Sequence, residues 1–130
     1  YIIHCGVFGC YERMMALILE KYAGALPLWI SPTQVKIMSL TDRTSDDAKK
    51  LALRLREQGI RCEVDVRNEK IGYKIREAQL EKVPYMIILG DKEKENEVVA
   101  VRSRNAGDLG TMTEKEFVDK LTKEITEKVC

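Results

Sequence analysis

The chain has 130 residues, of which 45% are hydrophobic and 33% are charged, and this length accommodates about one compact domain with a hydrophobic core. Lysine and arginine number 22 against 21 acidic residues, which excludes a protein that holds nucleic acid by bulk positive charge alone. Any contact with RNA should therefore be local and specific. The four cysteines show no repeated spacing and no secretory leader pattern is visible, so we expect free thiols, a reducing cytoplasm and no membrane partner.

The first 24 residues form a separate segment. We predict a short strand, a glycine turn and a helix over residues 12–22. The run from Met14 to Leu19 is apolar throughout, so it covers the whole circumference of the helix, and such a helix requires burial on every side. It is too short to span a membrane, which takes about 20 residues, so we expect a missing domain to cover it. Residues 25–33, with two prolines and Trp29, are predicted to be a linker.

The remaining residues, 34–130, alternate between strand and helix patterns. Strands are expected at residues 34–40, 61–66, 85–89 and 97–104, and helices at about 44–59, 71–82 and from 113 onward. Thr44 with Asp47, and Thr113 with Glu116, have the spacing of capping boxes, and Gly59 is a stop signal. The order predicts an α/β fold with a mixed, mostly parallel sheet of about five strands flanked by three helices.

Two of these elements have a clear polarity. The strand at 61–66 alternates, which places Cys62 and Val64 on an inner face and Asp65 on the polar face. The helix at 71–82 has an apolar stripe that includes Ile71 and Ala78. Its remaining side chains make it basic. The basic residues in and beside it are Lys70, Lys74, Arg76 and Lys82.

Polar side chains occur where the predicted strands end, which is where open α/β sheets bind ligands. Asn68 and Lys70 follow one strand and Glu93 follows another; an amide and a lysine suit the edges of unstacked bases. Arg102, with Arg104 on the same face of its strand, can form a two-pronged contact with a guanine edge. On residue type alone, the ordinary interpretation is a turn asparagine, a solvated lysine, a turn carboxylate and a solvent-facing arginine pair.

Longer strings give these residues a context. The stretches DVRNEKIGYKIREAQLEKVPYMIILGDKE and VAVRSRNAGDLGTM closely resemble the C-terminal anticodon-binding domain of bacterial-type threonyl-tRNA synthetases, which are class II enzymes. The resemblance covers nearly all of residues 25–126. It implies a class IIa anticodon-binding domain over residues 34–130, in which Asn68, Lys70, Glu93 and Arg102 match the family's anticodon-contacting side chains. It further implies recognition of the tRNA(Thr) anticodon within a ligase that joins threonine to tRNA with ATP.

The first 24 residues resemble the tail of the same enzymes' catalytic domain, including motif 3, here GCYERMMALIL. Arg13 matches the arginine that clamps ATP, a task suited to a permanent charge with a forked geometry. His4 matches a zinc ligand whose companions lie upstream, and a zinc site needs about three protein ligands. Cys5 and Cys10 replace the family's usual arginine and serine. Without the resemblance, the ordinary interpretation is that Arg13 pairs with nearby acidic residues and that His4 is a polar residue of a strand.

The resemblance also implies partners and cofactors for a longer protein. It implies that the parent enzyme uses ATP, zinc and magnesium, and that none of them is bound to this fragment. It also implies a catalytic domain upstream of this chain, and a parent enzyme that is a homodimer in the cytoplasm. The 130 residues alone should be inactive in charging tRNA, because motif 3 is only part of the ATP and amino-acid site.

Other functions find less support in the residues. The chain has no glycine-rich phosphate loop, no Ser/His/Asp set and a single histidine. His4 with Cys5 and Cys10 lacks the second cluster of a metal or redox centre. One alternative is a free-standing tRNA-binding or adaptor protein that has lost catalysis. Another is a small regulatory domain of flavodoxin-like topology, whose acidic pocket or phosphate loop is not visible.

Overall fold

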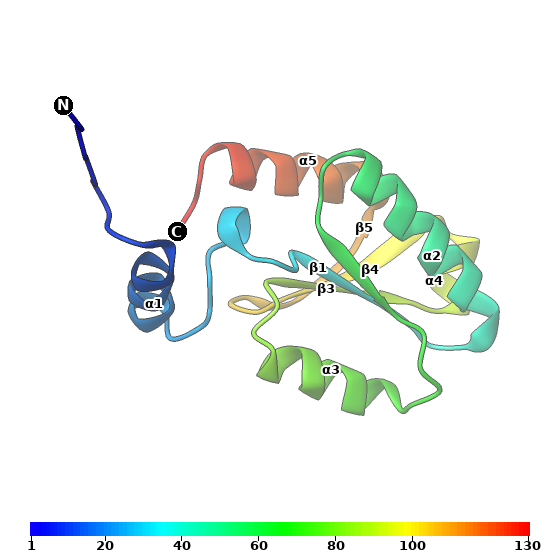
Figure 1. Ribbon diagram of the computed structural model, residues 1–130. Helices are drawn as coiled ribbons and strands as arrows, with labels where there is room; N and C mark the ends of the chain where they lie inside the picture. The colour runs from blue at the N-terminus through cyan, green and yellow to red at the C-terminus, as the bar shows by residue number, and fades with distance from the viewer.

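The computed structural model describes residues 1–130, and its centre is a single five-stranded sheet (Figure 1). The strands are β1 (Val35–Ser39), β2 (Cys62–Asp65), β3 (Tyr85–Leu89), β4 (Val98–Ser103) and β5 (Gly107–Thr113), in the spatial order β2-β1-β3-β4-β5. β2, β1 and β3 are parallel, while β4 is antiparallel to both of its neighbours. Four strands therefore share one direction, which confirms the predicted mixed, mostly parallel sheet.

Helices cover the two faces of this sheet unequally (Figure 1). The helices are α1 (Tyr11–Tyr22), α2 (Asp42–Glu57), α3 (Ile71–Leu80), α4 (Asp91–Glu95) and α5 (Glu114–Thr126), with a short 3₁₀ helix, η1 (Leu28–Ile30). α2 and α5 lie on one face, and α3 alone lies on the other. No helix is both long and apolar enough to cross a bilayer.

The main hydrophobic core lies between the sheet and the pair α2 and α5. It is a cluster of 16 buried residues, in which Ile37, Leu55, Ile87, Phe117 and Leu121 are each 0% exposed. The opposite cluster, under α3, has three buried members, Met38, Ala78 and Met86, with Ile71 and Ile75 packed against them. The α3 side of β4 and β5 is left without a covering helix, because α3 packs mainly on β1.

Capping explains where the helices begin. In α5 the predicted box is confirmed: Glu116 N donates to Thr113 Oγ1 (3.3 Å) and Thr113 N donates to Glu116 Oε2 (3.1 Å). In α2 the predicted box was misplaced by three residues. Thr41 is the N-cap and its backbone N donates to Thr44 Oγ1 (3.3 Å), because Thr41 has the same three-residue spacing to Thr44 that Thr44 has to Asp47.

Three local predictions were wrong. Residues 1–10 form no strand and are exposed, since this chain offers them no neighbouring strand to satisfy their backbone groups. Residues 90–96, which separate the expected strands at 85–89 and 97–104, contain the helix α4. β5 was not predicted, because Gly107, Asp108 and Gly110 have the composition of a turn; the strand nevertheless pairs along β4, with a register shift between Val101 and Arg102.

The predicted linker is docked on the domain. Gln34, 1% exposed, donates from Nε2 to Leu28 O (2.9 Å) and accepts from Arg61 N (2.9 Å). Arg61 Nε donates to Ser31 O (3.0 Å). These bonds join residues 28–34 to the start of β2, so the linker is part of the folded unit. α1, by contrast, has no buried residue.

Candidate nucleic-acid interface

Arg102 lies on the uncovered part of the sheet. It sits opposite Met86 of β3, and paired residues of neighbouring strands point to the same face, so its side chain lies on the α3 side. It is half-buried, and no hydrogen bond or ion pair within the chain engages its guanidinium. Asp108, its partner on β5, accepts instead from Gly110 N (2.8 Å). The fork of Arg102 is therefore free to bind a ligand.

Arg104 does not share this role, contrary to the sequence-based pairing with Arg102. It follows the end of β4, and its guanidinium donates to Lys82 O (2.7 Å) and Leu26 O (3.2 Å). Burial lowers the pKa of Arg104. These bonds attach the linker to the turn after α3, so Arg104 is a structural residue.

Asn68 and Lys70 are exposed in the loop between β2 and α3, at the carboxyl end of the sheet. Lys70 is the N-cap of α3, and its backbone carbonyl accepts from Tyr73 N (2.9 Å) and Lys74 N (3.2 Å). Neither side chain has a partner within the chain. β2 and β4 are three strand positions apart, which is about 14 Å at the usual spacing. The register places Arg102 level with Met86, Lys36 and Glu63, before the end of β2. The loop is therefore displaced from Arg102 along the strands as well as across them, and the two do not touch.

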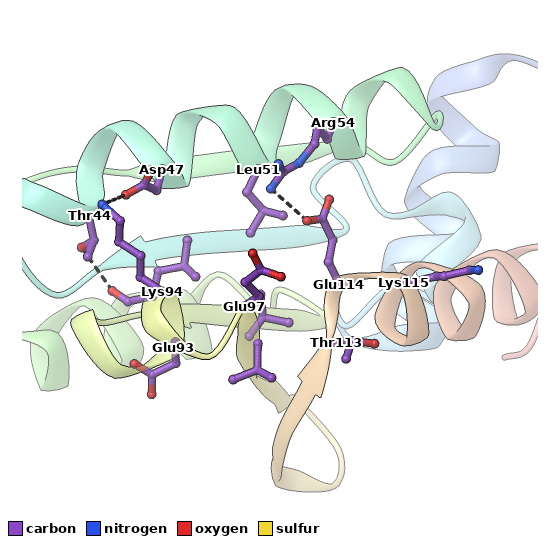
Figure 2. Close-up of a pocket in the computed structure, with 13 residues that line it drawn as sticks. Thr44, Asp47, Leu51, Arg54, Glu93, Lys94, Glu97, Thr113, Glu114 and Lys115 are labelled. Carbon is purple, nitrogen blue, oxygen red and sulfur yellow. Dashed lines mark hydrogen bonds and ion pairs between the residues drawn. The ribbon is translucent and has the colours of Figure 1, made fainter.

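Glu93 lies on α4, immediately after β3. Its Oε2 accepts from Gly90 N (3.1 Å), so one carboxylate oxygen caps the helix and the other remains available. A Cβ on Gly90 would lie 2.6 Å from Glu93 Oε2 and from Leu40 Cδ1, so any larger residue here would have to displace the ends of these two side chains. Figure 2 shows Glu93 pointing away from α2, on the opposite side from Asp47.

The largest hollow, of about 490 Å³, lies between α2, α4 and the start of α5 (Figure 2). Four of its charges are paired: Lys94 Nζ lies 2.7 Å from Asp47 Oδ2, and Arg54 Nη2 lies 2.8 Å from Glu114 Oε2. The hydrogen bond from Lys94 lowers the pKa of Asp47. The lining has four acidic and three basic side chains, so it does not favour a polyanion. The acids are Asp47, Glu93, Glu97 and Glu114 and the bases Arg54, Lys94 and Lys115.

Asp65, expected on a polar strand face, is 5% exposed. The face is covered by α3, and the carboxylate is tolerated there because Arg67 neutralises it. Arg67 Nη2 lies 2.6 Å from Asp65 Oδ2 and Nε lies 3.0 Å from Oδ1. Arg67 lowers the pKa of Asp65. It also pairs with Glu77 of α3.

Lys74, expected to be solvated, is also buried. It is 2% exposed and its Nζ donates to Ser39 O (3.2 Å) and Asp65 O (3.5 Å). A contact between Lys74 and RNA phosphate is therefore ruled out. The sequence did contain a signal, because Lys74 falls between Ile71 and Ala78 on the apolar stripe of the helix. Lys82 is exposed but donates to Ala23 O.

The two residues predicted for a catalytic role lie in the N-terminal segment. Arg13, on α1, and His4 are both exposed, and Arg13 forms no ion pair with Glu12. The chain has no group of three or more side chains placed to hold a metal ion. His4 alone does not make a zinc site.

Comparison with known proteins gives consistent matches. A family model described as "Anticodon binding domain" matches residues 34–124. The threonine--tRNA ligase of Clostridium tetani (strain Massachusetts / E88) is 57% identical over 128 residues, and that of Clostridium botulinum (strain Hall / ATCC 3502 / NCTC 13319 / Type A) is 54% identical over 127. Each alignment covers 98% of this chain and 20% of the relative. The chain thus spans about a fifth of the length of the curated relatives it matches.

A solved structure agrees with the sequence matches. The crystal structure of the RNA binding domain of threonyl-tRNA synthetase from Cryptosporidium parvum Iowa II has a TM-score of 0.82 at 32% identity, covering 87% of this chain and 28% of that chain. The resemblance seen in the sequence is confirmed. The family model spans more than half of the chain, and the chain therefore belongs to the anticodon-binding domain family.

Proposed function

We propose that this chain recognises the anticodon of tRNA(Thr) through the open α3 side of its sheet. One observation carries the proposal: the guanidinium of Arg102 lies on an uncovered strand with no partner inside the chain. An arginine that stabilises the fold normally donates to a carboxylate or a backbone carbonyl, as Arg67 and Arg104 do here. A free fork fits the two acceptors of a guanine edge.

The four proposed contacts have different tasks. Arg102 reads a guanine, while Asn68 offers an amide that both donates and accepts. Glu93 offers an acceptor to a base amine, and Lys70 offers a donor and a positive charge. Because the loop after β2 lies three strand positions from Arg102 and is also displaced from it along the strands, the two reach different nucleotides of a splayed single strand. Sequence-specific RNA recognition commonly uses such unstacked bases.

For the longer protein we propose a threonine-tRNA ligase, supported by the 54–57% identity to such ligases. Residues 1–24 are proposed to end its catalytic domain, residues 25–33 to join the two domains, and residues 34–130 to bind the anticodon. We assign ATP, zinc and magnesium to that longer protein, with Arg13 contacting ATP and His4 serving as a zinc ligand. We also propose that the longer protein is a homodimer. A cytoplasmic location is proposed from the four free cysteines.

Binding of short RNA hairpins tests the anticodon proposal directly. A short stem-loop can stand in for the whole tRNA, because the proposed contacts are confined to the loop. We expect the chain to bind a hairpin with a threonine anticodon more tightly than one in which the anticodon guanine is replaced by adenine. Equal binding of the two hairpins at several salt concentrations contradicts anticodon recognition. Separately, the mass of the native protein distinguishes a ligase, with several hundred upstream residues, from a free-standing adaptor.

A further inference from the structure

The layer beneath α3 contains a lysine whose presence stability alone does not explain. Lys74 is the largest of the fully buried side chains, at 2% exposure. Its ammonium bonds two backbone carbonyls and forms no ion pair with a carboxylate. A buried ammonium costs free energy unless it is well paired, and apolar residues of similar size often replace such groups without loss. The position therefore suggests a task other than filling the core.

The two carbonyls identify that task. Ser39 and Asp65 are the last residues of β1 and β2, so Lys74 ties the carboxyl ends of two parallel strands to α3. Lys74 N also donates to Lys70 O (3.2 Å), which joins it to the N-terminal cap of the helix. The side chain of Lys74 thus holds the β2 end of loop 66–70 through Asp65 O, while the α3 end is held by an ordinary helical backbone bond that does not depend on the lysine side chain.

A second anchor lies on the outer side of the same loop. Arg67 bridges the buried carboxylate of Asp65 and the α3 residue Glu77. Asn68 follows it directly, and Lys70 stands two residues later. The side chains that face solvent without partners are therefore the ones between the two anchors. A loop ordered in advance loses less entropy when it binds a ligand.

We propose that Lys74, assisted by Arg67, is a positioning residue that holds loop 66–70 in the geometry with which Asn68 and Lys70 contact RNA. The inference rests on the proposed anticodon function. It assigns Lys74 no contact with RNA, since its ammonium is occupied and enclosed. Its effect on binding must pass through the loop and must leave the contact of Arg102, three strands away, unaffected.

Lys36 supplies a matched control. It is also a buried lysine on the α3 side of the sheet, at 6% exposure, and its Nζ lies 2.5 Å from Glu81 Oε2 just beyond the end of α3. It anchors the far end of the helix, and its ammonium bonds Glu81 and no residue of loop 66–70, although it lines the same shallow hollow as Val66 and Arg67. Lys36→Met and Lys74→Met therefore remove the same charge from the same layer, and only the second should disturb the loop.

Double-mutant cycles on the 130-residue chain test the proposal, with the threonine-anticodon hairpin as the probe. Lys74→Met and Asn68→Ala should each weaken binding roughly three- to tenfold, comparable to one lost hydrogen bond. Their combination should bind within about twofold of the weaker single variant, because both remove the same contact. When Lys74→Met is combined with Arg102→Lys, the fold-loss in affinity for the hairpin should equal the product of the losses of the two single variants. Lys36→Met should bind as wild type, and amide hydrogen exchange should rise in residues 66–70 for Lys74→Met alone.

Several results overturn the proposal. They are wild-type binding by Lys74→Met, independent losses for Lys74→Met and Asn68→Ala, and an equal loss for Lys36→Met. If Lys74→Met does not fold, the exposed Arg67→Ala replaces it in the same cycles, and independence from Asn68 again contradicts the inference. Failure of the wild-type chain to bind the hairpin contradicts the proposed function. Wild-type binding with a normal loss for Arg102→Lys but none for Lys74→Met or Arg67→Ala contradicts only the positioning role.

Discussion

Arg102 of β4 lies directly opposite Met86 of β3, at the boundary between the covered and the open part of the sheet. Met86 is 1% exposed beneath α3, whereas Arg102 is only half-buried and has no partner. The buried methionine thus lies beside the aliphatic part of Arg102, while the guanidinium of Arg102 faces solvent. This packing holds the strand rigidly and leaves the guanidinium available, an arrangement suited to a base-reading side chain.

The hydrophobic core gives a first prediction. Phe117 of α5 is 0% exposed and packs edge-to-face on Tyr85, with ring centroids 5.9 Å apart. Phe117→Ala should lower the free energy of unfolding by about 3–5 kcal/mol, because it removes a large apolar side chain and leaves a cavity. Urea denaturation measures the change. The neighbouring exposed variant Asp119→Ala should change it by less than about 0.5 kcal/mol; similar values for the two variants contradict this packing.

The docked linker gives a second prediction. Gln34 satisfies both Leu28 O and Arg61 N. Gln34→Ala should destabilise the chain by about 1–3 kcal/mol for each backbone group left buried without a partner. Thermal and urea unfolding test this, with the exposed Gln58→Ala as control. No loss of stability in Gln34→Ala means that residues 28–34 are not held as described.

The capping boxes and the apolar stripe of α5 show what the sequence could predict. Thr113 and Glu116 bond each other three residues apart, and Phe117 and Leu121 recur at helical spacing, so local spacing predicts both the cap and the buried face. Lys74 was misassigned because its partners, the carbonyls of Ser39 and Asp65, are distant in sequence. Asp65 was misassigned because the packing of α3 over its face of the sheet is a tertiary feature, although its own partner, Arg67, is only two residues away.

The candidate site shows the same division. Strand ends could be located from the pattern, and with them the loop of Asn68 and Lys70. Arg102 has no partner because α3 leaves its part of the sheet uncovered. Arg104 is hydrogen-bonded because the linker docks beside it. Both are long-range features, and a run such as VAVRSR does not contain them. β5 was missed because its glycines are compatible with a turn as well as with an edge strand.

The pairing of Asp65 with Arg67 gives a third prediction, on pH. Arg67 lowers the pKa of Asp65 below its ordinary value of 3.8. Ionised Asp65 therefore stabilises the fold above pH 3.8, and this stabilisation disappears as the pH falls from 3.8 through the lowered pKa of the folded state. Asp65→Asn, which cannot ionise, should be less stable than wild type at neutral pH, and the difference should shrink in that acidic range. Urea midpoints between pH 2 and pH 6, chosen to span the ordinary pKa values of carboxyl groups, measure it. A difference independent of pH contradicts the ion pair.

The exposed helix α1 gives a fourth prediction. Met15 and Leu17 are each 62% exposed and no residue of the helix is buried. Exposed apolar patches promote association, so the chain should self-associate with rising concentration, and the chain lacking residues 1–24 should not. Its melting temperature should be unchanged, since α1 adds nothing to the core. Sedimentation at several concentrations tests this; a lower melting temperature without a change in association contradicts the account.

The most direct test of base reading by Arg102 is Arg102→Lys, which keeps the charge and removes the fork. Binding of the threonine-anticodon hairpin should weaken by roughly 1–3 kcal/mol, and discrimination against the hairpin with adenine for guanine should relax, with little change in salt dependence. Arg76→Ala, an exposed charge on α3, is the control: if it touches phosphate, it should weaken both hairpins alike and flatten the salt dependence. If Arg102→Lys binds and discriminates between the two hairpins as wild type does at both low and high salt, Arg102 does not read the anticodon.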